Sequence, residues 1–322
     1  MKREEIEREL KKYDSTVLSF PNRGPWGTSA YRGNCSGWLI AFFIWKFKVK
    51  TMAELFAGGG TGYDVCMDMG VPYVGIDLNP NPVREGIITM DILDKEQELP
   101  EGFYSADMVF AHPPYPSIQH VKYANSMWKD KGGELAQRDI QNMSWEDGMK
   151  AVNHAVMRGY ASMKPGAYEV VLVGDVRSKG QFHSMLQELI IPGQLEQVCV
   201  KLQHNTMSGR NTYSNGNFIP LAHEMVVVIK KPSGYEIAFT LPKKYCIDVR
   251  DSETSTWKDV VMAVLRKAGK VPVTNKDIYD AVKGHKKADK NHNVEAKIRQ
   301  TLQQLCVSGL VKHVQYGVWS AA

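Results

Sequence analysis

The residues best suited to chemistry lie at the end of a short apolar run, where the tetrapeptide His112-Pro113-Pro114-Tyr115 follows Met108–Ala111. Two consecutive prolines fix an extended backbone and supply no N–H donor. Their carbonyl groups can therefore accept hydrogen bonds beside an aromatic ring. This arrangement could hold a flat molecule that carries an NH₂ group while its nitrogen attacks an electrophile. The same residues also fit a rigid turn with a packed tyrosine, so the neighbouring elements must distinguish between the two interpretations.

A glycine-rich segment, Phe56–Gly62 (FAGGGTG), lies between a predicted strand at 52–56 and a predicted helix that ends near Met69. Glycines in this position let the backbone approach a ligand closely and turn helix N–H groups towards it. The next predicted strand, 73–76, is followed by Asp77, where a doubly wound sheet places a carboxylate for ribose hydroxyl groups. These residues together predict a site for a nucleoside cofactor.

The elements that must position these residues alternate between strand-length apolar runs and helix-length stretches as far as residue 232. This alternation predicts an α/β fold with a doubly wound, largely parallel sheet. The last two strands are expected to form an antiparallel hairpin. The further predicted strands are 87–90, 107–111, 168–173, 196–202 and 225–230, and the further predicted helices are 1–12, 37–47, 145–163 and 181–189.

The pattern changes after residue 254 to three predicted helices (257–268, 274–282, 293–306) and a small hairpin (310–314, 318–320), which together predict a winged helix-turn-helix. We therefore expect a first domain at 1–232, a linker at 233–254 and a winged-helix domain at 255–322. From Thr254 onward there are 12 Lys and Arg against 5 Asp and Glu, a net charge of +7, whereas the preceding residues carry a net −2. A basic end favours a polyanionic partner, although a solvated basic surface would have the same composition.

Several classes of protein are disfavoured by the composition. No segment approaches the roughly 18–20 apolar residues that span a bilayer, and the charged stretch 1–12 does not resemble a signal peptide. The five cysteines have no CxxC spacing, which predicts neither a metal site nor a disulfide framework. We expect a cytoplasmic protein without a membrane partner, and the sequence leaves its oligomeric state open.

The two motifs resemble those of the S-adenosylmethionine-dependent DNA amino-methyltransferases, which methylate adenine N6 or cytosine N4. The resemblance covers about residues 19–232 and includes a cofactor loop like 56–62 and a proline-proline-aromatic box like 112–115. It implies a class I (Rossmann-like) methyltransferase sheet, S-adenosylmethionine as cofactor, and a target base that has left the duplex. It also implies a bacterial or phage-encoded enzyme, with a cognate restriction enzyme as a conceivable partner.

The resemblance implies a role for each matching residue. The side chain of His112 and the carbonyl group of Pro113 would accept the two hydrogens of the target amino group, and Tyr115, next to Pro114, would stack on the base. Asp77 would hold the ribose, and Asp91 would lie near the cofactor adenine, with an ordinary loop aspartate as an equal alternative. The other implied cofactor-binding residues are Phe56, Ala57, Gly58, Gly60, Gly62, Asn34 and Ser36.

Basic and amide side chains are candidates for contact with double-stranded DNA. In the third helix of the winged-helix domain they face away from the apolar stripe, and Arg and Gln recognise guanine and adenine edges in the major groove. Lysines in the preceding loop suit phosphates. The candidates are Lys297, Arg299, Gln300 and Gln303 in the helix, Lys286, Lys287 and Lys290 in the loop, and Lys122 and Arg177 near the box. A protein-interaction role for the winged helix, a solvated loop for Lys122 and a surface salt bridge for Arg177 remain open.

His112 departs from the family pattern, which has Asp, Asn or Ser at this position. A neutral imidazole has one acceptor nitrogen, and below its pKa the ring becomes a donor only. We favour an active adenine-N6 methyltransferase, with cytosine N4 as its nearest alternative. RNA or protein-glutamine methylation is a second class, and a non-catalytic DNA-binding protein is a third. Methylation at cytosine C5 is disfavoured, because it needs a nucleophilic cysteine after proline and the sequence has no Pro-Cys pair.

Overall fold

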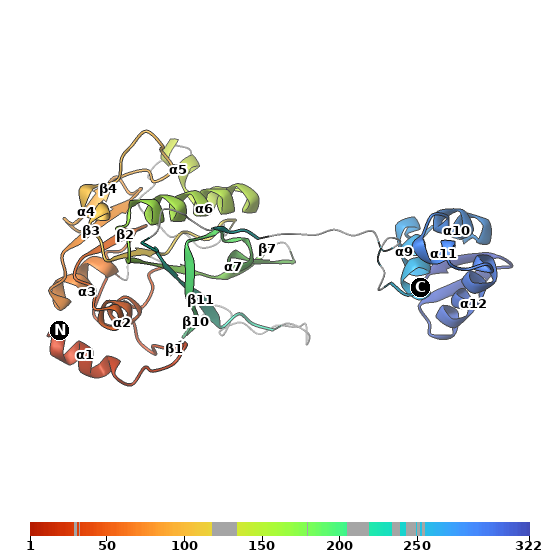
Figure 1. Cartoon of the computed structure of the whole chain (residues 1–322), viewed down its shortest axis with the longest axis horizontal. Coiled ribbons are helices and arrows are strands. Elements are labelled where there is room, and N and C mark those ends of the chain that lie inside the picture. The colour runs from red at the N-terminus through yellow and green to blue at the C-terminus, as the bar shows by residue number, and fades with distance from the viewer. Residues whose placement is uncertain are drawn as a thin grey trace. The chain divides into compact units, whose positions relative to one another are not determined.

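The computed structural model describes the chain except for residues 29–30, 32, 118–133, 179, 205–218, 234–238, 243–248, 250–251 and 253–254. The chain forms two compact units, Met1–Pro242 and Lys243–Ala322, and the division between them falls inside the predicted linker. Figure 1 shows both units, and each is described by itself. Among the described residues, no helix is both long and apolar enough to span a bilayer.

The first unit is built on a doubly wound sheet, as the sequence predicts. Eight strands of the described residues form it in the order β1-β10-β11-β6-β5-β2-β3-β4. The strands from β6 to β4 are parallel, and β11 runs antiparallel to both of its neighbours. Their bounds are β1 Val17–Ser19, β2 Met52–Leu55, β3 Tyr73–Asp77, β4 Ile87–Thr89, β5 Met108–Ala111, β6 Tyr168–Val173, β10 Gln194–Leu202 and β11 His223–Lys230.

Helices cover both faces of this sheet. On one face, α1 (Arg3–Leu10), α2 (Gly37–Phe47) and α3 (Thr61–Met69) contribute to one apolar core. On the other, α4 (Glu101–Tyr104) and α6 (Trp145–Ser162) contribute to a second core, and Figure 1 shows α6 on the opposite side of the strands from α2 and α3. Successive residues of each strand pack alternately into these two cores, because neighbouring side chains of a strand point to opposite faces of the sheet.

The carboxyl ends of the parallel strands meet at one edge of the sheet. The glycine loop follows β2, Asp77 ends β3, and His112 follows β5 directly. Because β11 is antiparallel, its first residues, His223 and Glu224, lie at this same edge. Ligands of open α/β sheets bind outside the carboxyl ends of the strands, so the fold brings the predicted site residues to the expected place.

One predicted helix, 181–189, is wrong. Residues Gln181–Ser184 form β8, which pairs with β7 (Asp175–Ser178), and only Met185–Glu188 is helical (α7). Gly180, immediately before β8, has a φ of +78°, which favours glycine. The short strands β9 (Ile191–Pro192) and β12 (Phe239–Thr240), helix α5 (Glu134–Arg138) and the 3₁₀ turn Ile140–Asn142 were not predicted.

The second unit has the order of elements expected of a winged helix. Its helices α10 and α12 pack on α9, and the strands form a sheet in the order β13-β15-β14. Thr274 caps α10 as predicted, its hydroxyl accepting a hydrogen bond from the N–H of Asp277 at 3.2 Å. The elements are α9 Trp257–Ala268, β13 Val273–Thr274, α10 Asn275–Val282, α11 Lys286–Asp289, α12 Val294–Val307, β14 Val311–Gln315 and β15 Val318–Ala321.

Candidate active site

A pocket opens at the carboxyl edge of the sheet. Its wall is formed by the loop after β2, the end of β3, the segment after β4 and the start of the box after β5. The predicted site residues that line it are Asn34, Phe56, Ala57, Gly58, Asp77, Asp91, His112, Pro113 and Pro114. The two motifs that the sequence places some fifty residues apart therefore share one pocket.

The glycine loop is fixed by Asp77. One carboxylate oxygen of Asp77 accepts a hydrogen bond from the N–H of Gly58 at 2.7 Å, and the other accepts one from the N–H of Asn79 at 2.9 Å. Gly58 has a φ of +44°, and a Cβ there would lie 2.9 Å from the ring of Tyr31. A Cβ on Gly59 would lie 2.4 Å from the amide group of Asn34. The loop is thus packed closely against Tyr31 and Asn34, and larger residues at these two positions would clash with them.

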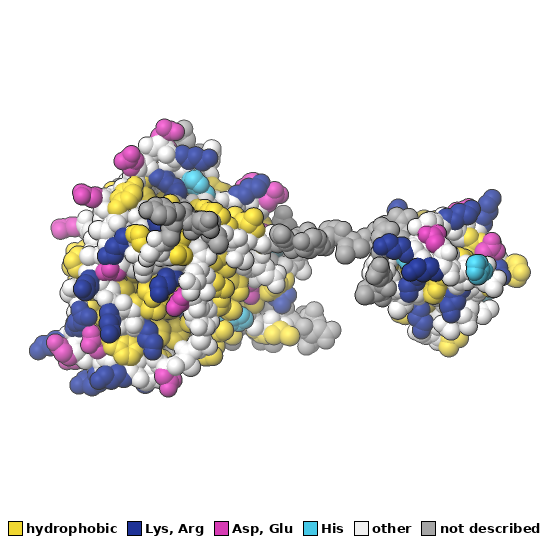
Figure 2. All heavy atoms as spheres, viewed as in Figure 1, with side chains coloured by type: hydrophobic (Ala, Val, Ile, Leu, Met, Phe, Trp, Pro, Cys, Tyr) yellow, Lys and Arg dark blue, Asp and Glu magenta, His cyan; other side chains and the backbone are white. Residues whose placement is uncertain are grey.

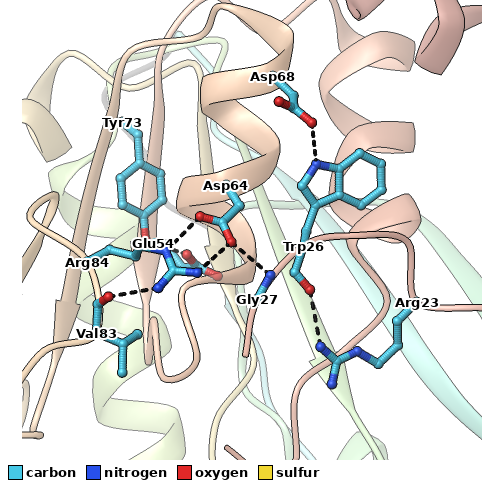
Figure 3. A network of polar contacts seen from close by, with 9 residues as sticks. All are labelled: Arg23, Trp26, Gly27, Glu54, Asp64, Asp68, Tyr73, Val83 and Arg84. Carbon is cyan, nitrogen blue, oxygen red and sulfur yellow. Dashed lines mark hydrogen bonds and ion pairs between the residues drawn. The ribbon is translucent and has the colours of Figure 1, made fainter. Parts of the chain in front are cut away.

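A polar network holds the segment before α2 against this loop, as Figure 3 shows. Asp64, in the first turn of α3, accepts hydrogen bonds from the N–H of Gly27 at 2.9 Å and from the guanidinium group of Arg84 at 2.8 and 2.9 Å. The indole N–H of Trp26 donates to Asp68 at 2.8 Å. These bonds hold residues 26–27 against α3, and Asn34, further along the same segment, lines the pocket.

Glu54 is a pocket residue that the sequence reasoning missed. It lies in β2, is 4% exposed, and accepts a 2.5 Å hydrogen bond from the hydroxyl of Tyr73. Burial raises the pKa of its carboxyl group to about 8. A Cβ on Gly62 would lie 2.2 Å from its carboxylate, so Gly62 makes room for Glu54 rather than lining the pocket. An acidic residue inside an otherwise apolar strand was the available signal.

The chemistry of the pocket wall fits S-adenosylmethionine. The hydroxyl oxygen of Thr61 is buried in this wall and has no hydrogen-bond partner among the described residues. Glu54 offers a carboxylate for a cationic ligand, and Asp77 retains acceptor capacity for hydroxyl groups. The wall therefore contains polar groups of the kind that an amino acid joined to a nucleoside requires.

His112 is held as a neutral ring. Its imidazole has a pKa of about 4, because burial lowers the pKa, the nearby charge of Glu224 opposes this shift and that of Lys201 adds to it. The ring contacts Tyr115 edge to face, with their centroids 5.9 Å apart. Above a pH of about 5 one ring nitrogen is therefore available as an acceptor. The neutral state that an acceptor at this position needs is provided by the fold.

Tyr115 is buried and does not belong to the pocket wall. It is 9% exposed, and its hydroxyl donates a 2.6 Å hydrogen bond to Glu224. A Cβ on Gly174, the residue after β6, would lie 2.6 Å from the tyrosine ring. Stacking of Tyr115 on a base stays a prediction.

Asp91 lines the pocket, but its carboxylate is already engaged. One oxygen accepts a 2.5 Å hydrogen bond from Arg138, and the other accepts one from the N–H of Leu93 at 2.9 Å. Arg138 itself belongs to the pocket wall. The predicted contact of Asp91 with the cofactor adenine is not tested by these bonds.

The remaining predicted residues lie away from the pocket wall or outside the described part. Gly60 precedes α3 with a φ of +76°, and the buried hydroxyl of Ser36 donates to the carbonyl oxygen of Asn22 at 3.2 Å. The guanidinium carbon of Arg177 lies 5.3 Å from the ring centre of Phe182 on the hairpin formed by β7 and β8. Lys122 lies outside the described residues.

Most of the predicted DNA-binding side chains of the winged-helix unit are exposed. Arg299, Gln300 and Gln303 are exposed on α12, and Lys297 is half-buried, while Ile298, Leu302 and Leu305 are buried as the predicted stripe. Lys286 and Lys290 are exposed at α11, and Lys287 is half-buried. Figure 2 shows Lys and Arg side chains over the visible face of this unit.

The topology of the first unit now assigns its fold. Its mixed eight-stranded sheet, with the antiparallel β11 between β6 and β10, is typical of class I methyltransferases. It is a class I methyltransferase fold. Residues 253–320 match the family of the Dam-replacing HTH domain. The chain therefore joins a unit of this fold to a helix-turn-helix domain.

Comparison with known proteins adds distant structural similarity. TrmN from Thermus thermophilus is 15% identical, with a TM-score of 0.37 over 62% of this chain and 50% of that chain. A SAM-dependent methyltransferase from Archaeoglobus fulgidus is 13% identical, with a TM-score of 0.35 over 61% and 95%. The N-methyltransferase NodS from Bradyrhizobium japonicum WM9, in complex with S-adenosyl-l-homocysteine, is 12% identical, with a TM-score of 0.34 over 72% and 98%. The match spans half the length of TrmN, and no curated protein matches in sequence.

Proposed function

We propose that this chain is a DNA methyltransferase that transfers the methyl group of S-adenosylmethionine to the exocyclic amino group of a base. The preferred target is adenine N6. The observation that carries the proposal is the shared pocket of the glycine loop and the acceptor edge formed by His112 and Pro113. The helix-turn-helix domain supports DNA as the substrate.

The pocket residues have distinct roles in this proposal. Gly58 and its neighbours border the space for the cofactor, and Asp77 accepts hydrogen bonds from the ribose hydroxyl groups of the cofactor. Glu54 faces the positive charge of the cofactor. When bound, S-adenosylmethionine supplies an electrophilic methyl group on a positively charged sulfur.

The acceptor edge acts on the amine. The lone pair of an exocyclic amino group is delocalised into the base, which makes the nitrogen a poor nucleophile. The neutral imidazole of His112 and the carbonyl group of Pro113 accept its two hydrogens and favour a pyramidal nitrogen with a directed lone pair. The contribution of these residues is positioning and electrostatic stabilisation, without a covalent intermediate on the protein.

Incubating the protein with labelled cofactor and mixed-sequence DNA, followed by mass spectrometry of the nucleosides, tests the proposal. Labelled N6-methyladenine is the expected product. N4-methylcytosine would keep the chemistry and correct the base. Cofactor binding without transfer to any DNA would contradict the proposed function, and a parallel RNA substrate would reveal a different nucleic acid.

The raised pKa of Glu54 leads to a measurable proton release. At pH 7 a carboxyl group with a pKa of about 8 is mostly protonated, and a bound cation favours its ionised form. We expect S-adenosylmethionine binding to release about 0.9 proton at pH 7 and almost none well above pH 8. Isothermal titration in buffers of different ionisation enthalpy measures this number. The Glu54→Gln variant should show no release, and a release that is the same at both pH values would exclude Glu54 as its source.

Lys286 and Lys287 are expected to contact phosphates rather than bases. Replacing both with alanine should weaken DNA binding by a similar factor on every sequence and reduce the slope of log affinity against log salt by about 1 to 2. Fluorescence anisotropy over a range of salt concentrations measures both quantities. The double variant Lys258→Ala/Lys267→Ala, which loses two exposed lysines of α9, is a control matched for lost charge. Unchanged affinity and an unchanged salt slope would remove α11 from the interface.

A further inference from the structure

A buried ion pair lies next to the box at residues 112–115. The ammonium group of Lys201 is 2.7 Å from a carboxylate oxygen of Glu224, and the two side chains are 11% and 8% exposed. The residues face each other across the antiparallel pair formed by β10 and β11. Burying two charges carries a large desolvation cost, so such a pair is weak evidence for stability by itself. Its position at the active edge of the sheet suggests a different role.

Glu224 connects this ion pair to the box. One of its oxygens binds Lys201, and the other accepts the 2.6 Å hydrogen bond from Tyr115. The tyrosine ring is packed against the backbone of Gly174 on one side and meets the His112 ring edge to face. A continuous series of contacts therefore runs from Lys201 through Glu224 and Tyr115 to His112.

The two charges also act on His112 in opposite directions. Glu224 favours a charged imidazole, Lys201 disfavours it, and burial then keeps the ring neutral. Among the described residues these are the charged groups that influence His112, and the titratable group in contact with its ring is Tyr115. A charged His112 would in turn favour the ionised form of Glu224.

We propose that Lys201 and Glu224 are positioning residues for amine methylation: Glu224 fixes Tyr115 through its hydroxyl group, and Lys201 balances the carboxylate so that a histidine can serve as the acceptor. This inference rests on the proposed function. It explains how the box tolerates His112 where the family it resembles has Asp, Asn or Ser. An aspartate or asparagine needs no neighbouring cation to remain an acceptor, whereas the pKa of a histidine would rise beside an unbalanced carboxylate.

The test compares the full-length wild type with Lys201→Met and with the double variant Lys201→Met/Glu224→Gln. Methyl transfer to DNA is measured from about pH 3 to about pH 9, a range that includes the pKa of about 4 of His112, together with the thermal melting temperature. In Lys201→Met the midpoint of the activity loss at low pH should rise above that of the wild type, so that the loss of rate grows as the pH falls towards it. The double variant, which lacks both charges, should return the midpoint towards that of the wild type.

Two outcomes would overturn the inference. A rate that falls by the same factor at every pH would mean that Lys201 serves structure alone, and an unmoved midpoint would mean that its charge does not reach His112. The pKa of His112 can also be measured by NMR on protein labelled with ¹⁵N-histidine, with Asn substituted at position 112 to assign the signal. This measurement does not require turnover. A wild type that methylates no substrate would contradict the proposed function, while a shifted NMR titration in Lys201→Met would still support the ion-pair effect.

Discussion

Replacing His112 with alanine is expected to lower the rate of methyl transfer by about 100- to 1,000-fold, the usual cost of one preorganised hydrogen-bonding group at a reacting centre. The imidazole is held neutral in the pocket wall, with a pKa of about 4, and its acceptor nitrogen would bind one hydrogen of the target amine. Single-turnover transfer of labelled methyl groups at saturating cofactor measures the loss. Affinity for S-adenosylmethionine should change little, because the cofactor cradle is formed by other residues.

Asparagine at position 112 distinguishes the contribution of the hydrogen-bond acceptor from that of the aromatic ring. Its side-chain carbonyl group accepts a hydrogen bond and does not titrate. The His112→Asn variant should therefore keep the rate within about tenfold of the wild type and lose less activity on acidification. If the alanine variant transferred methyl groups at the wild-type rate, the side chain at position 112 would have no part in the reaction. Equal losses for alanine and asparagine would point to the shape of the ring rather than to its acceptor.

Replacing Asp77 with asparagine is expected to weaken S-adenosylmethionine binding by about 100-fold. Both oxygens of Asp77 accept backbone hydrogen bonds, from Gly58 at 2.7 Å and from Asn79 at 2.9 Å. An amide group must turn its NH₂ towards one of these N–H donors, which leaves a buried donor unpaired and loosens the glycine loop. It also removes a charged acceptor for the ribose hydroxyl groups. Isothermal titration measures the affinity.

Asp94 provides the matched control for Asp77. Its carboxylate accepts a 3.0 Å hydrogen bond from the N–H of Glu96, two residues later, as Asp77 does from Asn79, but the Asp94 side chain does not line the pocket. The Asp94→Asn variant should bind the cofactor as the wild type does. Full affinity in the Asp77→Asn variant, measured alongside this control, would exclude Asp77 from the cofactor site.

The site residues that could be predicted from the sequence are those marked by a local sequence pattern. The glycine loop, Asp77 and the box each stand at the end of an apolar run, and parallel strands carry their carboxyl ends to one edge of the sheet. Residues 181–184 were misassigned, because their pairing with β7 comes from the turn at Gly180 and not from their own periodicity. Glu54 was missed although an acid inside an apolar strand is a signal, because the strand pattern does not show that its side chain lines the pocket.

The sequence by itself determined the fold class, the winged-helix order of elements and nine of the residues that line the pocket, since these depend on local patterns of glycine, proline and apolar side chains. Only the tertiary structure decided the state of His112. That state depends on burial and on Lys201 and Glu224, and Glu224 lies 109 residues from its partner Tyr115. Electrostatic fields and desolvation act through space, so the sequence pattern of the box could not show whether its histidine is an acceptor.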